Sequence, residues 1–187
     1  MKKNILTSII LLLTLTVSCN HNPQTTMKEN PQNLWEERLK AEMPLLGHRN
    51  WIVVTDMAYP LQSAPGIETI YADEDFDKVL TKVKASIDAL PHVFAHVYHD
   101  REMNFLTDSL APGIEKVKEN IRRLYGEEAK SMVHEDIITR LDRASKLYKI
   151  LIVKTPLTIP YTSVFLELDC KYWSAERQQQ LDDLMHK

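Results

Sequence analysis

The sequence predicts an α/β fold: one layered domain whose mostly parallel sheet is flanked by helices. Two observations support this prediction. Short apolar runs rich in β-branched residues alternate along the chain with stretches whose apolar residues recur every three to four positions, as in βαβ units. Residues 33–187, which contain no internal repeat or low-complexity tract, also make a segment of the right size for a single domain with a full core.

The N-terminal segment is typical of an exported bacterial lipoprotein. Residues 1–18 begin with Lys2 and Lys3, continue with an apolar run and end in a serine before Cys19. The apolar run is shorter than the roughly 20 residues of a membrane-spanning helix. We therefore interpret residues 1–18 as a signal peptide, Cys19 as the lipid-modified N-terminus and the polar residues 19–32 as a tether. The mature protein is expected to be anchored to a membrane through this lipid only and to face the periplasm.

The expected elements follow one another in a regular order. Apolar residues recur at helical spacing, which predicts helices, over residues 33–43, 75–90, 114–124, 134–146 and 174–185. Apolar, β-branched runs predict strands over residues 51–55, 66–71, 92–98, 129–133, 150–154 and 161–168. In α/β proteins the loops that follow the parallel strands are the expected ligand site, and Asp56 lies directly after the first strand.

Composition and motifs argue against several classes of function. Leaving out Lys2 and Lys3 reduces the 23 basic residues to 21 against 26 acidic ones, so the mature protein is mildly acidic and nucleic acid is not an expected partner. The four glycines are too far apart for a phosphate-binding loop, so we expect no nucleotide cofactor. With Cys19 lipidated, Cys170 is the one remaining thiol, and no intrachain disulfide is expected.

His48 and two hydroxyl-bearing residues are candidates for chemistry. His48 lies in a turn before the strand 51–55, where a neutral imidazole can take and give protons near physiological pH; a surface or capping histidine is the alternative interpretation. Tyr161 and Ser163 would alternate onto one face of the last strand. Their hydroxyls could bind a polyol, or they could be buried and hydrogen-bonded within the sheet.

Three further histidines are spaced like metal ligands. On a helix, His92, His96 and His99 would share one face, but in the strand expected here His99 would point away from the other two. We interpret His92 and His96 as hydrogen-bonded packing residues, and His99 with Asp100 as part of the loop at the strand end. A metal-binding surface protein that uses the three histidines is an alternative, but we expect no metal.

Two motifs resemble the ribose pyranase and fucose mutarotase family. Members have a Gly-His pair near the N-terminus, an aspartate eight residues after the histidine and a proline four residues later; Gly47, His48, Asp56 and Pro60 keep this spacing. Near the C-terminus of the family a turn leads to Pro-Tyr-Ala-Asn or Tyr-Gly-Asn at the start of the last strand. Residues 160–163 of this chain, Pro-Tyr-Thr-Ser, take that place.

The resemblance implies a cofactor-free α/β fold that assembles into homo-oligomeric rings, often decamers, with each pocket completed by a neighbouring subunit. It also implies an isomerase that interconverts ring forms or anomers of a monosaccharide, with His48 as the general acid/base. Asp56 would accept hydrogen bonds from sugar hydroxyls or orient the histidine, and Tyr161 with Ser163 would bind the sugar. His134 resembles a sugar-binding histidine of the ribose branch of the family.

The chain departs from the family pattern on one side of the implied pocket. Ser163 stands where the family has asparagine, and Pro156 and Leu157 stand where it usually has a Gly-Glu pair. Both changes remove or shorten polar groups. The alternative function is therefore a non-catalytic, lipid-anchored monosaccharide-binding protein of the same fold.

Overall fold

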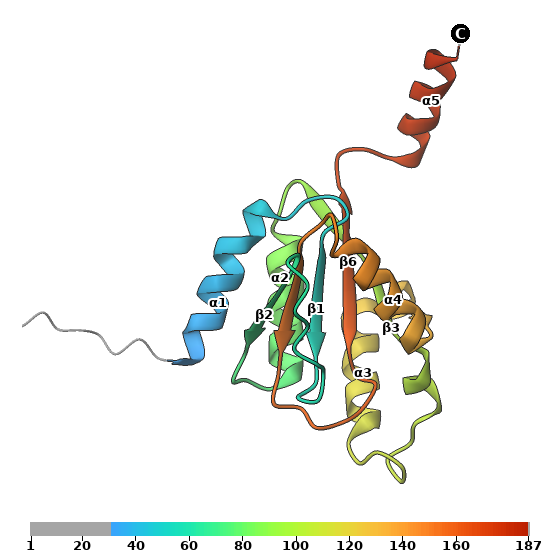
Figure 1. Cartoon of the computed structure of the whole chain (residues 1–187). Helices are drawn as coiled ribbons and strands as arrows, with labels where there is room; N and C mark the ends of the chain where they lie inside the picture. Colours follow the sequence, from blue (N-terminus) through green and yellow to red (C-terminus); the bar gives the residue numbers. More distant parts are fainter. Residues whose placement is uncertain (1–30, 187) are drawn as a thin grey trace, which may run out of the picture.

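The computed structural model describes residues 31–186 (Figure 1). The signal peptide, Cys19 and the tether up to residue 30 lie outside this range. The α-helices are α1 (Pro31–Glu42), α2 (Phe76–Asp88), α3 (Ile114–Tyr125), α4 (His134–Ala144) and α5 (Ala175–Met185). The strands are β1 (Trp51–Thr55), β2 (Ile67–Tyr71), β3 (Val93–Asp100), β4 (Lys130–Met132), β5 (Ile150–Lys154) and β6 (Val164–Cys170). Within residues 31–186, no helix has both the length and the apolar character needed to cross a membrane.

The six strands form one sheet in the order β2-β5-β1-β6-β3-β4. The pairs β2 with β5, β5 with β1 and β3 with β4 are parallel, whereas β6 runs antiparallel to both of its neighbours, β1 and β3. The predicted mostly parallel sheet flanked by helices is therefore confirmed. Because β6 is reversed, its first residue Val164 pairs with Val54 and His99 near the carboxyl ends of β1 and β3.

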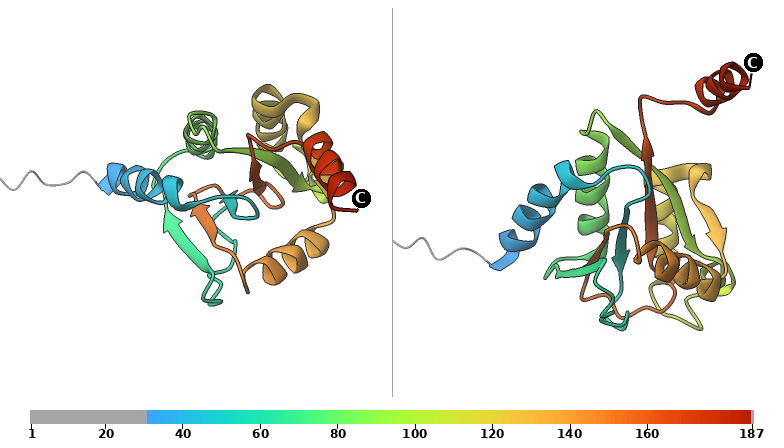
Figure 2. Two further views of the ribbon diagram at one scale, coloured as in Figure 1. Left: turned by 90° about the horizontal axis from the view of Figure 1, so that it is seen from above. Right: turned by 45° about the horizontal axis from the view of Figure 1, so that its top comes forward.

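Helices cover both faces of this sheet and produce three layers (Figure 2). α1, α2 and α3 lie on one face, where Ile52 and Val54 of β1 belong to the larger apolar core. α4 covers the other face, where Trp51 and Val53 pack with Ile137. All five residues of β1 are buried because successive side chains point to opposite, equally covered faces. This is why β1 is a continuous apolar run and not an alternating pattern.

The last strand begins three residues later than expected. It starts at Val164, so Tyr161 and Ser163 lie in the connection before β6 and not on one face of it. Tyr161 has a φ of 57°, in the left-handed region, which is incompatible with an extended strand. The apolar composition of residues 161–168 therefore indicated burial correctly but placed the strand boundary too early.

The third strand extends two residues beyond its expected end. His99 and Asp100 belong to β3, and the expectation that they lie in a loop is wrong. His99 pairs with Val164 of β6 on one side and with Ser131 of β4 on the other. Two flanking strands thus hold the end of β3 in an extended conformation that its polar sequence does not suggest.

The C-terminal helix stands apart from the rest of the molecule (Figure 1). α5 has no buried residue, and Leu181, Leu184 and Met185 are exposed. Local bonds define its start: Ser174 caps the helix by accepting from the backbone N–H of Arg177. The polar C-terminal helix expected from the sequence is present, but it contributes nothing to the core.

Gly66, just before β2, occupies a position that admits no side chain. A Cβ atom there would overlap the carbonyl oxygen of Ser145 and lie 2.8 Å from that of Tyr148. Replacing Gly66 by alanine is expected to lower the free energy of unfolding by about 1–3 kcal/mol, because backbone atoms must move apart. Urea unfolding checks this, with Gly47→Ala as the control, since no atom lies within 4 Å of a Cβ at Gly47. Equal stability of the two variants would contradict the prediction.

Candidate functional site

The expected site residues fall at two opposite ends of the sheet. His48 precedes β1, whereas Asp56 follows it. Along β6, Val164 is the first residue, and Asp169 lies next to the last one, five residues further on, which corresponds to about 17 Å in an extended strand. We call the residues at one end, His48, Arg49, His96 and Asp169, the His48 cluster. We call those at the other end, Asp56, Asp100, His134 and Tyr161, the carboxyl-end cluster.

In the His48 cluster, Asp169 binds two histidines. Its Oδ1 lies 2.6 Å from Nδ1 of His48, and its Oδ2 lies 3.0 Å from Nε2 of His96. Burial by itself would raise the pKa of Asp169, but hydrogen bonds from His96, from the backbone N–H of Cys170 and from His48 outweigh it and hold the pKa below its ordinary value. Asp169 is therefore an ionised acceptor near neutral pH.

The neighbour of His48 defines its tautomer. Nε of Arg49 donates a hydrogen bond of 3.1 Å to Nε2 of His48. Because arginine can only donate, Nε2 must carry a lone pair, so the proton of the neutral imidazole is on Nδ1 and points to Asp169. The His48 side chain is 53% exposed. Nε2 is therefore the ring nitrogen that could act as a base if a ligand replaced Arg49 as its hydrogen-bond partner, while Asp169 holds the proton on Nδ1.

A polar hollow of about 290 Å³ adjoins His48. Besides the His48 cluster, it is lined by Tyr98, Lys130, Arg140, Glu167 and Leu168. The guanidinium of Arg140 lies 5.2 Å from the ring centre of Trp51 and 5.3 Å from that of Tyr98, and it pairs with Glu167 at 2.6 Å. The hydrogen-bond donors and acceptors that line this hollow suit a small polar molecule.

The carboxyl-end cluster is built around a second histidine–aspartate pair. Asp100, the last residue of β3, is fully buried, and its Oδ1 lies 3.0 Å from Nδ1 of His134 at the start of α4. Both carboxylate oxygens of Glu102 accept from the backbone N–H of His134, at 3.1 and 3.3 Å. The rings of His134 and Tyr161 meet edge to face, with centroids 5.6 Å apart. These contacts fix the position of the His134 ring.

Burial makes Asp100 a weaker acid than an ordinary aspartate. It raises the pKa of Asp100 to about 6; the hydrogen bond with His134 acts in the opposite direction, and the negative charges of Glu102 and Asp56 add to the rise. Burial also lowers the pKa of His99, whose Nδ1 lies 3.0 Å from the carbonyl oxygen of Asp100. The end of β3 is therefore a place where charge is costly, so that Asp100 keeps its proton to a higher pH and His99 loses its proton more readily.

Asp56 and Ser163 lie at the same end of the sheet. Oδ1 of Asp56 accepts from the backbone N–H of Ala58 at 2.8 Å, and the residue is 8% exposed. Ser163 is 1% exposed, and its hydroxyl shares a hydrogen bond of 2.8 Å with that of Thr55. The Ser163 hydroxyl thus already has a partner inside the protein, whereas Tyr161 remains 40% exposed.

Backbone strain marks both clusters. Among residues 31–186, Arg49 and Tyr161 are the two residues other than glycine with positive φ, at 71° and 57°. This conformation costs of the order of 1–2 kcal/mol for a residue with a side chain and is concentrated at functional sites. One strained residue lies beside His48 and the other beside His134.

The remaining histidines have structural partners. Nε2 of His92 lies 2.9 Å from the carbonyl oxygen of Leu46, and His96 contacts Asp169 as described. The hydrogen bonds expected of His92 and His96 are present, but His96 is 40% exposed and lines the polar hollow beside His48, so the expectation that it is a packing residue is wrong. In the part of the chain that the structure describes, no group of three or more histidine, cysteine or acidic side chains is arranged to hold a metal ion.

Sequence reasoning missed Asp100, Arg49 and Asp169 as members of these clusters. Asp100 was expected in a loop, and Asp169 had no assigned role. A usable signal existed for Asp169, because Glu167 and Asp169 are both polar and two residues apart in an otherwise apolar run. Because alternate residues of a strand point to the same face, this spacing indicates that one face of the strand is exposed to solvent near its C-terminal end.

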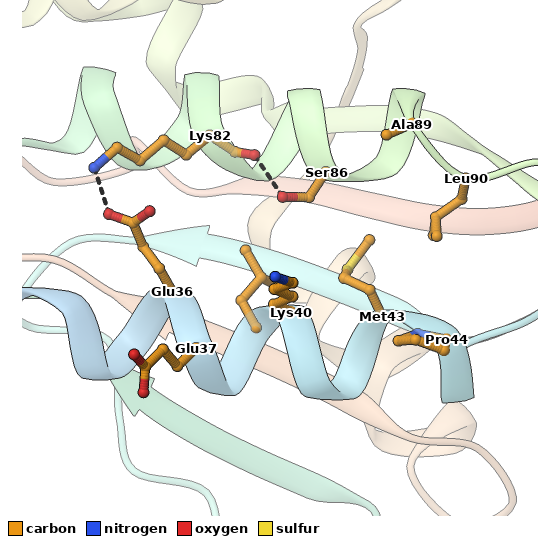
Figure 3. Close-up of a pocket in the computed structure, with 10 residues that line it drawn as sticks. Glu36, Glu37, Lys40, Met43, Pro44, Lys82, Ser86, Ala89 and Leu90 are labelled. Atoms are coloured by element: carbon orange, nitrogen blue, oxygen red, sulfur yellow. Dashed lines mark hydrogen bonds and ion pairs between the residues drawn. The ribbon is translucent and has the colours of Figure 1, made fainter.

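A hollow larger than the one beside His48 lies elsewhere (Figure 3). A groove of about 640 Å³ separates α1 from α2, with Leu39, Met43 and Leu90 among the residues that line it and the pair Lys82 with Glu36 toward one end. None of the expected site residues lines this groove. It offers no histidine and therefore no group that exchanges protons readily near neutral pH.

Comparison with known proteins supports the fold. No protein-family model and no curated protein sequence matches the chain. Among solved structures, RbsD of Bacillus subtilis, complexed with D-ribose, is similar with a TM-score of 0.52 and 15% sequence identity, over 71% of this chain and 91% of that one. A fucose mutarotase from Streptococcus pneumoniae, in complex with L-fucose, has a TM-score of 0.49 and 17% identity, over 76% and 98% of the two chains. The likeness to RbsD confirms the fold that the two motifs implied.

Proposed function

We propose that this chain is a cofactor-free isomerase that interconverts the ring forms or anomers of a monosaccharide at a site shared by two copies. His48 of one copy would be the general acid/base, and the carboxyl-end cluster of the other would bind the sugar. The observation that carries this proposal is that the two clusters lie at opposite ends of the sheet, near Asp169 and Val164 of β6, which are about 17 Å apart in an extended strand. A single monosaccharide is too small to touch both ends of one sheet.

The reaction requires two proton transfers. The anomeric hydroxyl loses its proton as the bond between the anomeric carbon and the ring oxygen breaks, and the ring oxygen gains a proton. The open-chain sugar then rotates about a carbon–carbon bond and closes again by the reverse transfers. A histidine whose Nε2 carries a lone pair and whose Nδ1–H is held by a carboxylate can take and return such a proton.

The carboxyl-end cluster supplies binding groups of the kind that a sugar needs. Asp56 offers carboxylate oxygens to hydroxyl donors, His134 offers a ring nitrogen, and the half-exposed Tyr161 offers both an aromatic face and a hydroxyl. The D-ribose complex of the similar RbsD makes pentoses the first sugars to examine. L-Fucose, bound by the mutarotase of Streptococcus pneumoniae, is the second.

Complementation between inactive variants tests the shared site. The variants His48→Ala and Asp56→Asn are each expected to be unable to accelerate the exchange between the ring forms of the sugar. When the two are unfolded together and reassembled in equal amounts, some sites combine an intact His48 with an intact Asp56. With random assembly, about a quarter of the wild-type exchange should return. Saturation-transfer NMR between the pyranose, furanose and anomeric signals of D-ribose measures it, and light scattering measures the assembly state.

Three outcomes would contradict the proposal. A chain that remains monomeric, or variants that never complement although each reassembles with wild-type size, would exclude a shared site. Absence of accelerated exchange for every pentose and deoxyhexose offered would exclude the isomerase. Calorimetric binding of a sugar without any exchange would instead support the non-catalytic alternative.

A further inference from the structure

Asp100 is a buried acid for which neither motif provides a role. It is 0% exposed, and its Oδ2 has no hydrogen-bond partner within residues 31–186. A buried carboxylate with one bare oxygen is costly, so its presence calls for an explanation beyond packing. Its single side-chain partner is His134, through Oδ1.

The surroundings of His134 leave one ring nitrogen for a ligand. Nδ1 is directed to Asp100, and Glu102 holds the backbone N–H of the same residue. Tyr161 contacts the ring edge to face. Because Nδ1 points to a fully buried atom and the side chain is 31% exposed, the opposite side of the ring, with Nε2, is the part that a ligand can approach.

We infer that Asp100 is a positioning residue: by accepting the Nδ1–H of His134 it keeps Nε2 unprotonated, as an acceptor for a sugar hydroxyl beside Tyr161. This inference rests on the proposed function and deepens it. A carboxylate can only accept, so it selects the Nδ1–H tautomer of a neutral imidazole. Without Asp100, the ring could turn or place its proton on Nε2, which would then repel a ligand hydroxyl that donates.

The inference also restricts the ligand. The sugar must donate a hydroxyl proton to Nε2, so the analogue methylated at that oxygen should bind poorly, because the bound ligand would cover this acceptor and leave it unpaired. An analogue methylated at a hydroxyl that faces solvent should bind as the parent does. Comparing a set of singly O-methylated D-riboses identifies the position concerned.

The tautomer of His134 can be measured without any sugar. Long-range ¹H–¹⁵N NMR of the full protein, labelled with ¹⁵N-histidine, distinguishes a protonated Nδ1 from a protonated Nε2. At about pH 8, where Asp100 is ionised, we expect His134 to carry its proton on Nδ1. A His134→Gln variant assigns the signal. Finding the proton of wild-type His134 on Nε2 overturns the inference.

Two matched variants separate positioning from charge. Asp100→Asn should shift His134 toward the Nε2–H tautomer and raise KM for the sugar about 10- to 100-fold, with a smaller change in kcat. Glu102→Gln changes a carboxylate on the same histidine but should leave the tautomer unchanged, since Glu102 contacts only the backbone N–H. Equal tautomer populations in wild type and Asp100→Asn would overturn the inference. Absence of any sugar exchange in the wild type, with His134 still protonated on Nδ1, would instead show that the proposed function is wrong.

Discussion

Replacing His48 by alanine is expected to lower the enzymatic exchange between sugar ring forms by about 10²- to 10⁴-fold, the usual contribution of a general acid/base. The physical reason is that only the two histidines of the His48 cluster combine a lone pair with a readily exchanged proton, and Nε2 of the other one, His96, is directed to Asp169. Arg49 only donates, and Asp169 is an ionised acceptor whose pKa lies below its ordinary value. Saturation-transfer NMR of D-ribose and L-fucose measures the loss.

The control for this loss is another exposed histidine. His186 follows α5, which has no buried residue and stands apart from the sheet (Figure 1), and His186→Ala should leave exchange unchanged. Because His48 is half exposed, its removal should change the free energy of unfolding by less than about 1 kcal/mol. Exchange that persists in a folded His48→Ala protein would refute the assigned role of His48.

The second large effect concerns stability and pH. Because the pKa of Asp100 rises from 3.8 to about 6 on folding, the native state binds more protons than the unfolded chain between these two values. The stabilisation by the protonated acid is complete below about pH 4 and is lost as the pH rises through 6. The loss amounts to about 3 kcal/mol, from a shift of about two pKa units.

Comparing wild type with a variant that lacks the Asp100 carboxyl group separates the contribution of Asp100 to stability from that of the other titrating groups. The contribution of Asp169 to stability changes with pH in the opposite direction. Because its pKa is lowered in the folded protein, Asp169 stabilises the fold above the ordinary pKa of an aspartate and does so less in acid. Glu102, Asp56, Tyr59 and His134 also face Asp100 or affect its charge. Urea unfolding of wild type and Asp100→Asn should therefore be compared at several pH values between 4 and 7. Parallel stability curves for the two proteins would contradict the predicted pKa shift.

Local patterns in the sequence predicted most of the fold. The stripe from Phe76 to Ile87 predicted α2, and the covered run Trp51 to Thr55 predicted β1, because burial of one helical face or of two strand faces leaves a periodic trace in the residues themselves. Boundaries that depend on neighbouring strands were misplaced. The end of β3 and the start of β6 are defined by pairing with each other, which neither segment shows alone.

For the site, the sequence alone placed His48 before β1 and Asp56 after it, and the motif spacing connected them with Tyr161. The prediction of an exported, lipid-anchored protein also rests on sequence alone and stays a prediction. Only the tertiary structure showed the partners of the two histidines: Asp169 lies 121 residues from His48, and Asp100 lies 34 residues from His134. The reversed β6 between β1 and β3 carries Asp169 to the His48 end of the sheet, while the α3 and β4 crossover brings His134 back to the end of β3. Such pairings arise from strand order, and strand order is a property of long-range packing that leaves no periodic trace in the chain.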